Sequence, residues 1–315
     1  MVKKFILGNQ LVDIFNKHRI ESLFFIDIGA KDELDFLGTV SSITTIVGFE
    51  PNPIELKRLK EKYSKNNFKS LELLADCVSD AEGTVSFNIA NRSSMSSLLE
   101  KDADNYQKHF GLYKNFENWK SNIGIDSVIT TSAITLDHFI TDKNAVIDYL
   151  KIDTQGSELK ILRGAEKLLN EKRINVLKIE VSTIAVYQDQ VLFSDIDIYL
   201  RHKGYILVDL ITYKENYAPV FGDTHDKNPH ATPCGDAIYV LDSGFLTNEN
   251  KIKSGVLLLW LGYASLGSYL INTSDLSSEE KKVLANYDFR PFGKRIKQLV
   301  VNLCPPIVLH WFKNR

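Results

Sequence analysis

The sequence predicts an α/β fold built on a seven-stranded, mostly parallel Rossmann-like sheet with helices on both faces, followed by a C-terminal helical appendage. Up to about residue 245, short apolar runs of strand length alternate with stretches of helical periodicity, a pattern typical of parallel sheets. Glycine or an acidic residue directly follows several of these runs. From residue 250 onward the periodicity indicates helices only. We therefore expect two domains, residues 1–245 and 246–315.

The first part of the chain alternates helices and strands. A helix is expected over residues 9–20, where apolar residues recur at helical spacing. A second helix is expected over residues 53–63, with Asn52 as its cap and Pro53 in its first turn. Strands are expected at residues 24–28, 46–49, 71–74 and 84–90.

The alternation resumes after residue 126. A helix is expected to begin at Glu158, where a carboxylate in the first turn favours the helix dipole. Another is expected over residues 194–203 and ends at Gly204. The expected strands are residues 127–134, 146–152, 176–181, 205–211 and 236–241.

Residues 91–122 interrupt the alternation with a serine-rich turn, NRSSMSSL, and a polar segment rich in aromatic residues. One interpretation is a lid over a cleft. The other is a helical segment whose aromatic face packs on the core, and we favour it because large aromatic side chains are mostly buried. The residues concerned are Tyr106, His109, Phe110, Tyr113, Phe116 and Trp119.

The ends of the first two strands suggest a nucleoside site. The run FFIDI is followed by Gly29, which allows a tight turn, and the run IVGF is followed by Glu50. A carboxylate at the second position can accept both ribose hydroxyl hydrogens of an adenosine. The further glycines needed to approach a pyrophosphate are missing, so a dinucleotide is disfavoured. A mononucleoside cofactor without phosphates is favoured, which points to S-adenosylmethionine.

Composition excludes several classes of protein. The chain has 315 residues, 44% hydrophobic and 25% charged, as expected for a globular protein. A net charge of -2 argues against nucleic-acid binding, because no positive field collects phosphates. Three scattered cysteines fit neither a disulfide framework nor a zinc site. The N-terminus has no signal-peptide core, so we expect a cytoplasmic protein.

Between residues 20 and 242 the chain carries a series of motifs in a specific order: FFIDIGA, VGFEPNP, CVSDAEGTVSF, the serine turn ending in SSL, TLDHFI, YLKIDTQGSELKILRGA and LKIEVS. Together these motifs resemble the FkbM-type methyltransferases, a branch of the class I S-adenosylmethionine-dependent enzymes. The resemblance departs from the usual family pattern at Lys31 to Leu34, where the family has a small polar residue and a second glycine.

The resemblance implies a set of cofactor-binding residues at the carboxyl ends of the strands. Asp27, Gly29 and Ala30 would line the methionine end of the cofactor. The ribose would lie against Glu50 with Pro51 beside it, the adenine edge would lie against Asp76 and Cys77, and Asp153 would face the reacting end. Asp76 and Asp153 have a second interpretation as caps of the turns that follow them.

The general base is left open by the sequence. A hydroxyl acceptor needs a group that takes its proton, and the candidates are Asp153, Glu180, His225 and His230. Asp153 and Glu180 end neighbouring strands, so a magnesium ion between them is a hypothesis, but two carboxylates are too few to assign a metal. The histidines have a second interpretation as surface residues.

The expected activity is O-methylation of a hydroxyl on a sugar, glycan or glycolipid intermediate, which would place the enzyme in polysaccharide biosynthesis. The acceptor is expected to be a small molecule or a glycan, as family habit implies. A non-catalytic binding module with this fold and an NAD-dependent oxidoreductase remain alternatives. The oligomeric state cannot be read from the sequence.

The C-terminal region has two open interpretations. Residues 254–274 carry no charge, and we favour a helix packed against protein over a membrane span because no second comparable segment exists. Residues 289–315 combine six Lys or Arg with apolar and aromatic residues and no acid. These residues either contact the inner face of a membrane or pack on the uncharged segment, and Pro305 and Pro306 favour packing.

Overall fold

The computed structural model describes residues 2–31, 34, 40–142, 144–216 and 230–285. The chain divides into two compact units. One comprises Ser22–Asp32 and Ile43–Leu246, and the other comprises Met1–Glu21, Glu33–Ser42 and Thr247–Arg315. The larger unit contains the whole of the predicted sheet. The boundary predicted at residues 245 and 246 stays a prediction about independently folding domains.

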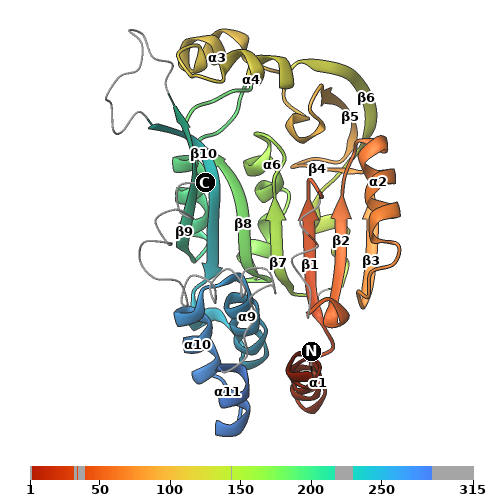
Figure 1. Cartoon of the computed structure of the whole chain (residues 1–315), viewed down its shortest axis with the longest axis vertical. Coiled ribbons are helices and arrows are strands. Elements are labelled where there is room, and N and C mark those ends of the chain that lie inside the picture. The colour runs from red at the N-terminus through yellow and green to blue at the C-terminus, as the bar shows by residue number, and fades with distance from the viewer. Residues whose placement is uncertain (1, 32–33, 35–39, 143, 217–229, 286–315) are drawn as a thin grey trace. The chain divides into compact units, whose positions relative to one another are not determined.

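The larger unit is built on a seven-stranded sheet in the order β3-β2-β1-β7-β8-β10-β9 (Figure 1). All strands run parallel except β10, which is antiparallel to β8 and β9. The predicted fold class is therefore confirmed. The strands are β1 (Leu23–Ile28), β2 (Thr44–Phe49), β3 (Ser70–Leu74), β7 (Ile147–Ile152), β8 (Ile174–Ser182), β9 (Tyr205–Asn216) and β10 (His230–Leu241).

The centre of the sheet forms the core because its strands are nearly continuous apolar runs. Every residue of β7 is buried, and β8 is buried over most of its length. Strands covered on both faces need such runs, whereas one-sided strands alternate. Strand order reverses between β1 and β7, so the edge beyond their carboxyl ends is where ligands bind in folds of this kind.

The helices of this unit begin close to the predicted positions. Helix α2 (Pro53–Tyr63) is capped by Asn52, whose side chain accepts a hydrogen bond from Ile54 N at 3.0 Å. Helix α8 (Phe193–His202) ends before Gly204, as predicted. The helix predicted from Glu158 is divided into α6 (Glu158–Arg163) and α7 (Glu166–Asn170). Between them, a Cβ on Gly164 would stand 2.0 Å from Ser79 O, so the chain bends where it touches that backbone.

Two predicted strands belong to a second, three-stranded sheet in the order β4-β6-β5. It contains β4 (Cys77–Val78), β5 (Gly83–Ala90) and β6 (Ile125–Ile134). The expectation that residues 84–90 and 127–134 continue the main alternation was wrong. Strand β6 is largely exposed, so it lacks the two apolar faces that a central strand of the main sheet requires.

The aromatic insertion contains helices α3 (Ala103–Phe110) and α4 (Phe116–Asn122), with the short helix η2 (Ser93–Met95) before them. Tyr106, Phe110, Tyr113 and Phe116 are buried together, and Phe110 and Trp119 have ring centroids 4.4 Å apart. The favoured interpretation, an aromatic face packed in the interior, is confirmed for these residues. Figure 1 shows both helices at the end of the main sheet where β7 and β8 finish.

The smaller unit contains α1 (Val2–Lys17), α9 (Asn248–Leu261), α10 (Ala264–Asn272) and α11 (Ser278–Ala285). The uncharged segment bends at Gly262, whose φ of +100° ends α9. Gly255 and Gly267 let α9 and α10 approach closely, since a Cβ on Gly267 would stand 2.9 Å from Gly255 O. In the described part of the chain, no helix has the length and apolar character needed to cross a bilayer. Residues 289–315 lie outside the described residues, so the membrane contact stays a prediction.

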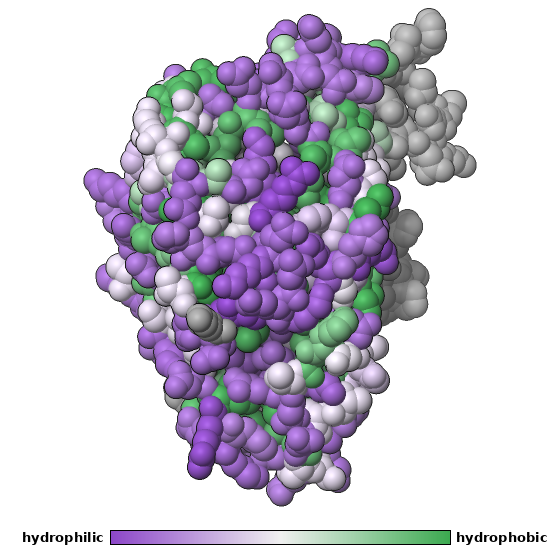
Figure 2. Space-filling view, turned by 180° about the vertical axis from the view of Figure 1, so that it is seen from behind, coloured by the Kyte–Doolittle hydropathy of each residue, from purple (hydrophilic) through white to green (hydrophobic). Residues whose placement is uncertain are grey.

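The surface seen from behind is dominated by hydrophilic side chains, with hydrophobic residues scattered in small groups (Figure 2). Such a mixture is ordinary for the outside of a folded chain, because polar groups alone cannot cover its surface.

Candidate active site

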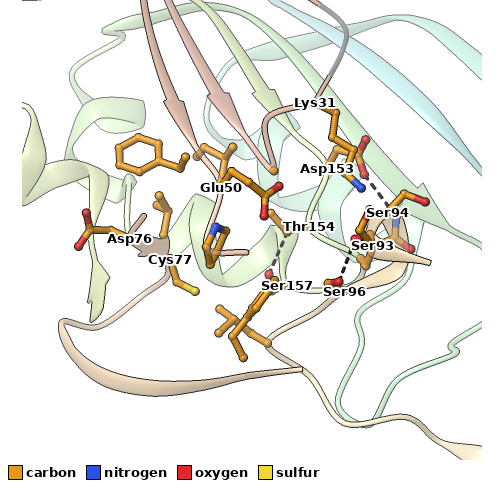
Figure 3. Close-up of a pocket in the computed structure, with 18 residues that line it drawn as sticks. Lys31, Glu50, Asp76, Cys77, Ser93, Ser94, Ser96, Asp153, Thr154 and Ser157 are labelled. Atoms are coloured by element: carbon orange, nitrogen blue, oxygen red, sulfur yellow. Dashed lines mark hydrogen bonds between the residues drawn. The ribbon is translucent and has the colours of Figure 1, made fainter. Parts of the chain in front are cut away.

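A cavity lies at the carboxyl ends of β1, β2 and β7. The cavity also takes residues from β4 and from the serine turn, as Figure 3 shows. The predicted residues that line it are Gly29, Glu50, Pro51, Asp76, Cys77 and Asp153.

Gly29 makes the turn that opens the cavity. Its φ of +76° is a left-handed conformation that favours glycine. The amides of Gly29 and Ala30 both donate to Phe49 O, at 3.0 and 2.9 Å. These bonds draw the ends of β1 and β2 together. Ala30 is fully buried and is not part of the lining, so its predicted contact with the cofactor is not seen in the cavity wall.

Asp27 was predicted to line the methionine end of the cofactor, but it is not among the residues that line the cavity and lies in a buried ion pair. Lys151 Nζ is 3.1 Å from Asp27 Oδ1 and 3.6 Å from Asp153 Oδ2, and it donates to Gly29 O at 3.3 Å. Both Asp27 and Lys151 are almost fully buried. Sequence reasoning did not single out Lys151. A lysine inside the apolar strand IDYLKI was the available signal, because a buried ammonium needs acidic partners.

Glu50 points into the cavity from the end of β2 (Figure 3). One carboxylate oxygen accepts a hydrogen bond from Asn52 N at 2.8 Å. Burial raises the pKa of Glu50 to about 7, although this hydrogen bond works in the opposite direction. The carboxyl group is thus poised between its two protonation states near neutral pH.

Asp76 and Cys77 lie on the other side of Glu50 in Figure 3. Asp76 accepts a hydrogen bond from the hydroxyl of Ser132. Burial raises the pKa of Cys77 to about 12, so its thiol stays neutral. Val78 and Phe87 add apolar surface beside them. This side of the cavity therefore offers one carboxylate and an apolar wall.

The loop after β7 is held by several hydrogen bonds. Glu158 accepts hydrogen bonds from the backbone amides of Thr154 and Gly156, at 3.1 and 3.0 Å, and from the Thr154 hydroxyl at 3.1 Å. Ser97 Oγ donates to Gln155 O at 2.8 Å, which ties the loop to the serine turn. Gln155 has a φ of +58°, an uncommon conformation for a residue other than glycine. Glu158 thus holds this loop in addition to starting α6.

Gln155 connects Asp153 with Glu180. Its side-chain amide donates to Glu180 Oε2 at 2.7 Å and to Asp153 Oδ1 at 3.3 Å. Burial, together with the nearby charges of Asp153 and Glu158, raises the pKa of Glu180 well above its ordinary value. The amide occupies the position between the two carboxylates where a magnesium ion was considered. Among the described residues, no group of three or more metal-ligating side chains is found.

A second cavity adjoins the first, and Gln155 lines both. Its wall is largely apolar and comes partly from the aromatic insertion, through Met95, Phe110, Trp119, Ile123, Val186 and Tyr187. Its polar lining consists of Gln155, Glu180, Ser182 and Gln190. Glu180 is thus the one ionisable carboxylate among the described residues that line this cavity.

The two histidines predicted as bases are placed only in part. His225 lies outside the described residues. His230 is the first residue of β10, opposite Asn216 of β9, and three residues before Pro233 of the second cavity. Their roles stay predictions.

Comparison with protein families decides what this arrangement belongs to. The model of the methyltransferase FkbM domain matches residues 27–207, which contain both cavities except for the residues contributed by β10. The chain belongs to the FkbM methyltransferase family. Members of this family use S-adenosylmethionine, so the resemblance found in the sequence and the cofactor inferred from Gly29 and Glu50 are confirmed.

Solved structures similar to this FkbM methyltransferase are methyltransferases too. The magnesium protoporphyrin IX methyltransferase of Synechocystis, solved with bound S-adenosylmethionine, has a TM-score of 0.35 and 8% identity, over 76% of this chain and 83% of that chain. The precorrin-6y C5,15-methyltransferase of Geobacter metallireducens has a TM-score of 0.33 and 13% identity, over 75% and 87%. No curated protein matches the chain in sequence.

Proposed function

We propose that this FkbM methyltransferase transfers the methyl group of S-adenosylmethionine to a hydroxyl of a sugar, glycan or glycolipid intermediate, with Glu180 as the general base. The observation that carries this proposal is the pair of cavities that meet at Gln155, with Glu180 on the wall of the second. The family assignment favours methyl transfer over the alternatives of an NAD-dependent oxidoreductase and a non-catalytic module.

The residues of the first cavity suit the cofactor. We assign the ribose hydroxyls to Glu50, since it directly follows β2 and only one of its two carboxylate oxygens accepts from Asn52 N. The apolar wall beside Asp76 and Cys77 suits the adenine ring. Asp153 is hydrogen-bonded to Gln155, which lines both cavities, so the reacting end of the cofactor is proposed to lie beside Asp153.

The chemistry requires little of the protein beyond alignment and proton removal. S-adenosylmethionine supplies a methyl group that is already activated by its sulfonium. A hydroxyl becomes a useful nucleophile when a base accepts its proton, and a positioned base contributes about 10²–10⁴-fold. The raised pKa of Glu180 makes it a stronger base than an ordinary carboxylate. Gln155 holds one of its oxygens, which leaves the other for the acceptor.

The second cavity suits an uncharged acceptor with an apolar face and several hydroxyls. Trp119 and Phe110 offer aromatic surface on which the C–H face of a sugar ring can lie. Gln190 and Ser182, which are hydrogen-bonded to each other, add polar atoms to the lining. An anionic acceptor is disfavoured because Glu180 and Asp153 would repel it.

Replacing Glu180 by Gln tests the proposal. The amide keeps the shape of the side chain but cannot accept the proton, so turnover should fall about 10²–10⁴-fold. The affinity for S-adenosylhomocysteine, measured by calorimetry, should stay unchanged. The control is Glu61→Gln, which alters an exposed carboxylate on α2.

His230→Ala and His225→Ala are measured beside these variants across pH. We expect only Glu180→Gln to remove the rising limb of the rate profile. Full turnover in Glu180→Gln, with that limb lost in His230→Ala or His225→Ala instead, would assign the base to a histidine and overturn this part of the proposal.

A further inference from the structure

Lys31 is the one cationic side chain among the described residues that line the cofactor cavity. It follows Gly29 and Ala30 in the turn after β1. In Figure 3, Lys31 lies beside Asp153 on one side of Glu50, and Asp76 lies on the other side. Lys31 therefore brings a positive charge to the cavity in which the cofactor is expected to bind.

The ammonium group of Lys31 is buried, and it has no hydrogen-bond partner among the described residues. Burying an ammonium without a partner costs several kcal/mol, so such groups are rare unless a ligand completes them. Burial accordingly lowers the pKa of Lys31.

The acidic residues whose charges act on Lys31 do not supply this partner, because none of them has an oxygen within hydrogen-bond distance of its ammonium group. Glu50 accepts from Asn52 N at 2.8 Å, and Asp153 accepts from the Gln155 side chain at 3.3 Å. Glu55 accepts from Arg58 at 2.9 Å and from the Ser93 hydroxyl at 3.2 Å. Their charges offset the effect of burial on Lys31 without forming an ion pair with it.

The positions of the residues that line the cavity indicate which part of the cofactor lies near Lys31. The adenine wall beside Asp76 and Cys77 and the ribose acid Glu50 occupy one side, so the amino-acid end of the cofactor extends toward Lys31 and Asp153. That end carries an ammonium, a sulfonium and a single anionic group, the α-carboxylate. The negative charge of Asp153 is complementary to the ammonium and sulfonium groups of the cofactor, and the positive charge of Lys31 is complementary to its α-carboxylate.

We propose that Lys31 binds the α-carboxylate of S-adenosylmethionine through a charge-assisted hydrogen bond. The proposal rests on the cofactor orientation given under the proposed function. It does not depend on which residue is the general base. The α-carboxylate of the cofactor would give the buried Lys31 ammonium the hydrogen-bond partner that it otherwise lacks. Cofactor binding would therefore remove the free-energy cost of burying that ammonium.

Two ligands that differ only in the carboxylate test this contact: S-adenosylmethionine and its decarboxylated form. Calorimetry measures the affinity of both for the wild type, Lys31→Met and the control Lys57→Met, which alters an exposed lysine on α2. In Lys31→Met, S-adenosylmethionine should bind about tenfold to a hundredfold more weakly, the range for a hydrogen bond between charged groups. The decarboxylated ligand should bind Lys31→Met and the wild type equally well.

A thermal melt separates binding from structure. Since Lys31→Met removes a buried ammonium without a partner, the melting temperature of the ligand-free protein should rise or stay the same. Equal weakening of both ligands, or unchanged binding of S-adenosylmethionine, would overturn the proposal. If the carboxylate preference of the wild type disappears in Lys31→Met while Glu180→Gln keeps full turnover, the carboxylate contact stands and the catalytic proposal fails.

Discussion

The Cα of Gly29 faces the backbone carbonyl of Asp153 so closely that a Cβ on Gly29 would stand 2.0 Å from that oxygen. The contact joins the ends of β1 and β7, the two strands between which the strand order reverses. Asp153 N in turn donates to Ile28 O at 3.0 Å. The first glycine of the motif is therefore needed for the approach of two strand ends as well as for the turn.

Gly29→Ala should destabilise the protein by about 2–4 kcal/mol, because a Cβ adds overpacking to an unfavourable left-handed backbone. The matched control is Gly83→Ala, since Gly83 also has a positive φ, +142°, but nothing lies within 4 Å of a Cβ placed there. Urea unfolding of both variants measures the difference. Equal losses in the two variants would show that the backbone conformation alone, and not the contact with Asp153, makes Gly29 necessary.

Glu50→Gln should weaken cofactor binding and stabilise the cofactor-free protein. The amide can still accept from Asn52 N, but the charge that accepts the ribose hydroxyls is lost, so affinity should fall about tenfold to a hundredfold. The folded pKa of about 7 lies above the unfolded value of 4.5. The stability associated with the protonated form is present below pH 4.5 and is lost as the pH rises through 7.

The free energy of unfolding of Glu50→Gln should therefore exceed that of the wild type by a small amount at pH 5 and by about 3 kcal/mol at pH 8. This figure converts the difference between the folded and unfolded pKa values of Glu50 at 1.36 kcal/mol per pKa unit. Urea unfolding at both pH values measures it, with the exposed Glu72→Gln as control. A gain that does not grow between pH 5 and 8 would mean that burial does not perturb Glu50 in this way.

The first cavity could be located from the sequence because the positions of its residues follow from where the strands end. Gly29 and Glu50 directly follow apolar runs, and parallel strands bring their carboxyl ends to one edge of the sheet. The cap at Asn52 and the ends of α2 were also predictable, because they depend on neighbours within a few residues.

What the sequence could not give are contacts between distant segments. Lys151 with Asp27, and Ser97 with Gln155, join residues more than fifty positions apart. Strand pattern alone also did not separate β5 and β6 from the main sheet, since strand propensity does not name the partner strand. Gln155 lines both cavities, but its role was not predictable from the sequence. A glutamine amide does not ionise, so nothing in the sequence distinguishes it from the neighbouring acids Asp153 and Glu158 as a site residue.

Trp119→Leu should impair acceptor binding alone, since Trp119 lines the second cavity and not the first. Losing an aromatic surface costs about 0.5–1.5 kcal/mol, so the KM for a sugar acceptor should rise about twofold to twelvefold with S-adenosylhomocysteine affinity unchanged. Phe116→Leu is the matched control, because Phe116 and Trp119 both pack on Tyr106 but Phe116 is not part of the cavity lining. Steady-state kinetics with saturating cofactor measures both. A similar rise of KM in Phe116→Leu would trace the effect to packing of the aromatic cluster and would remove the evidence for an aromatic acceptor wall.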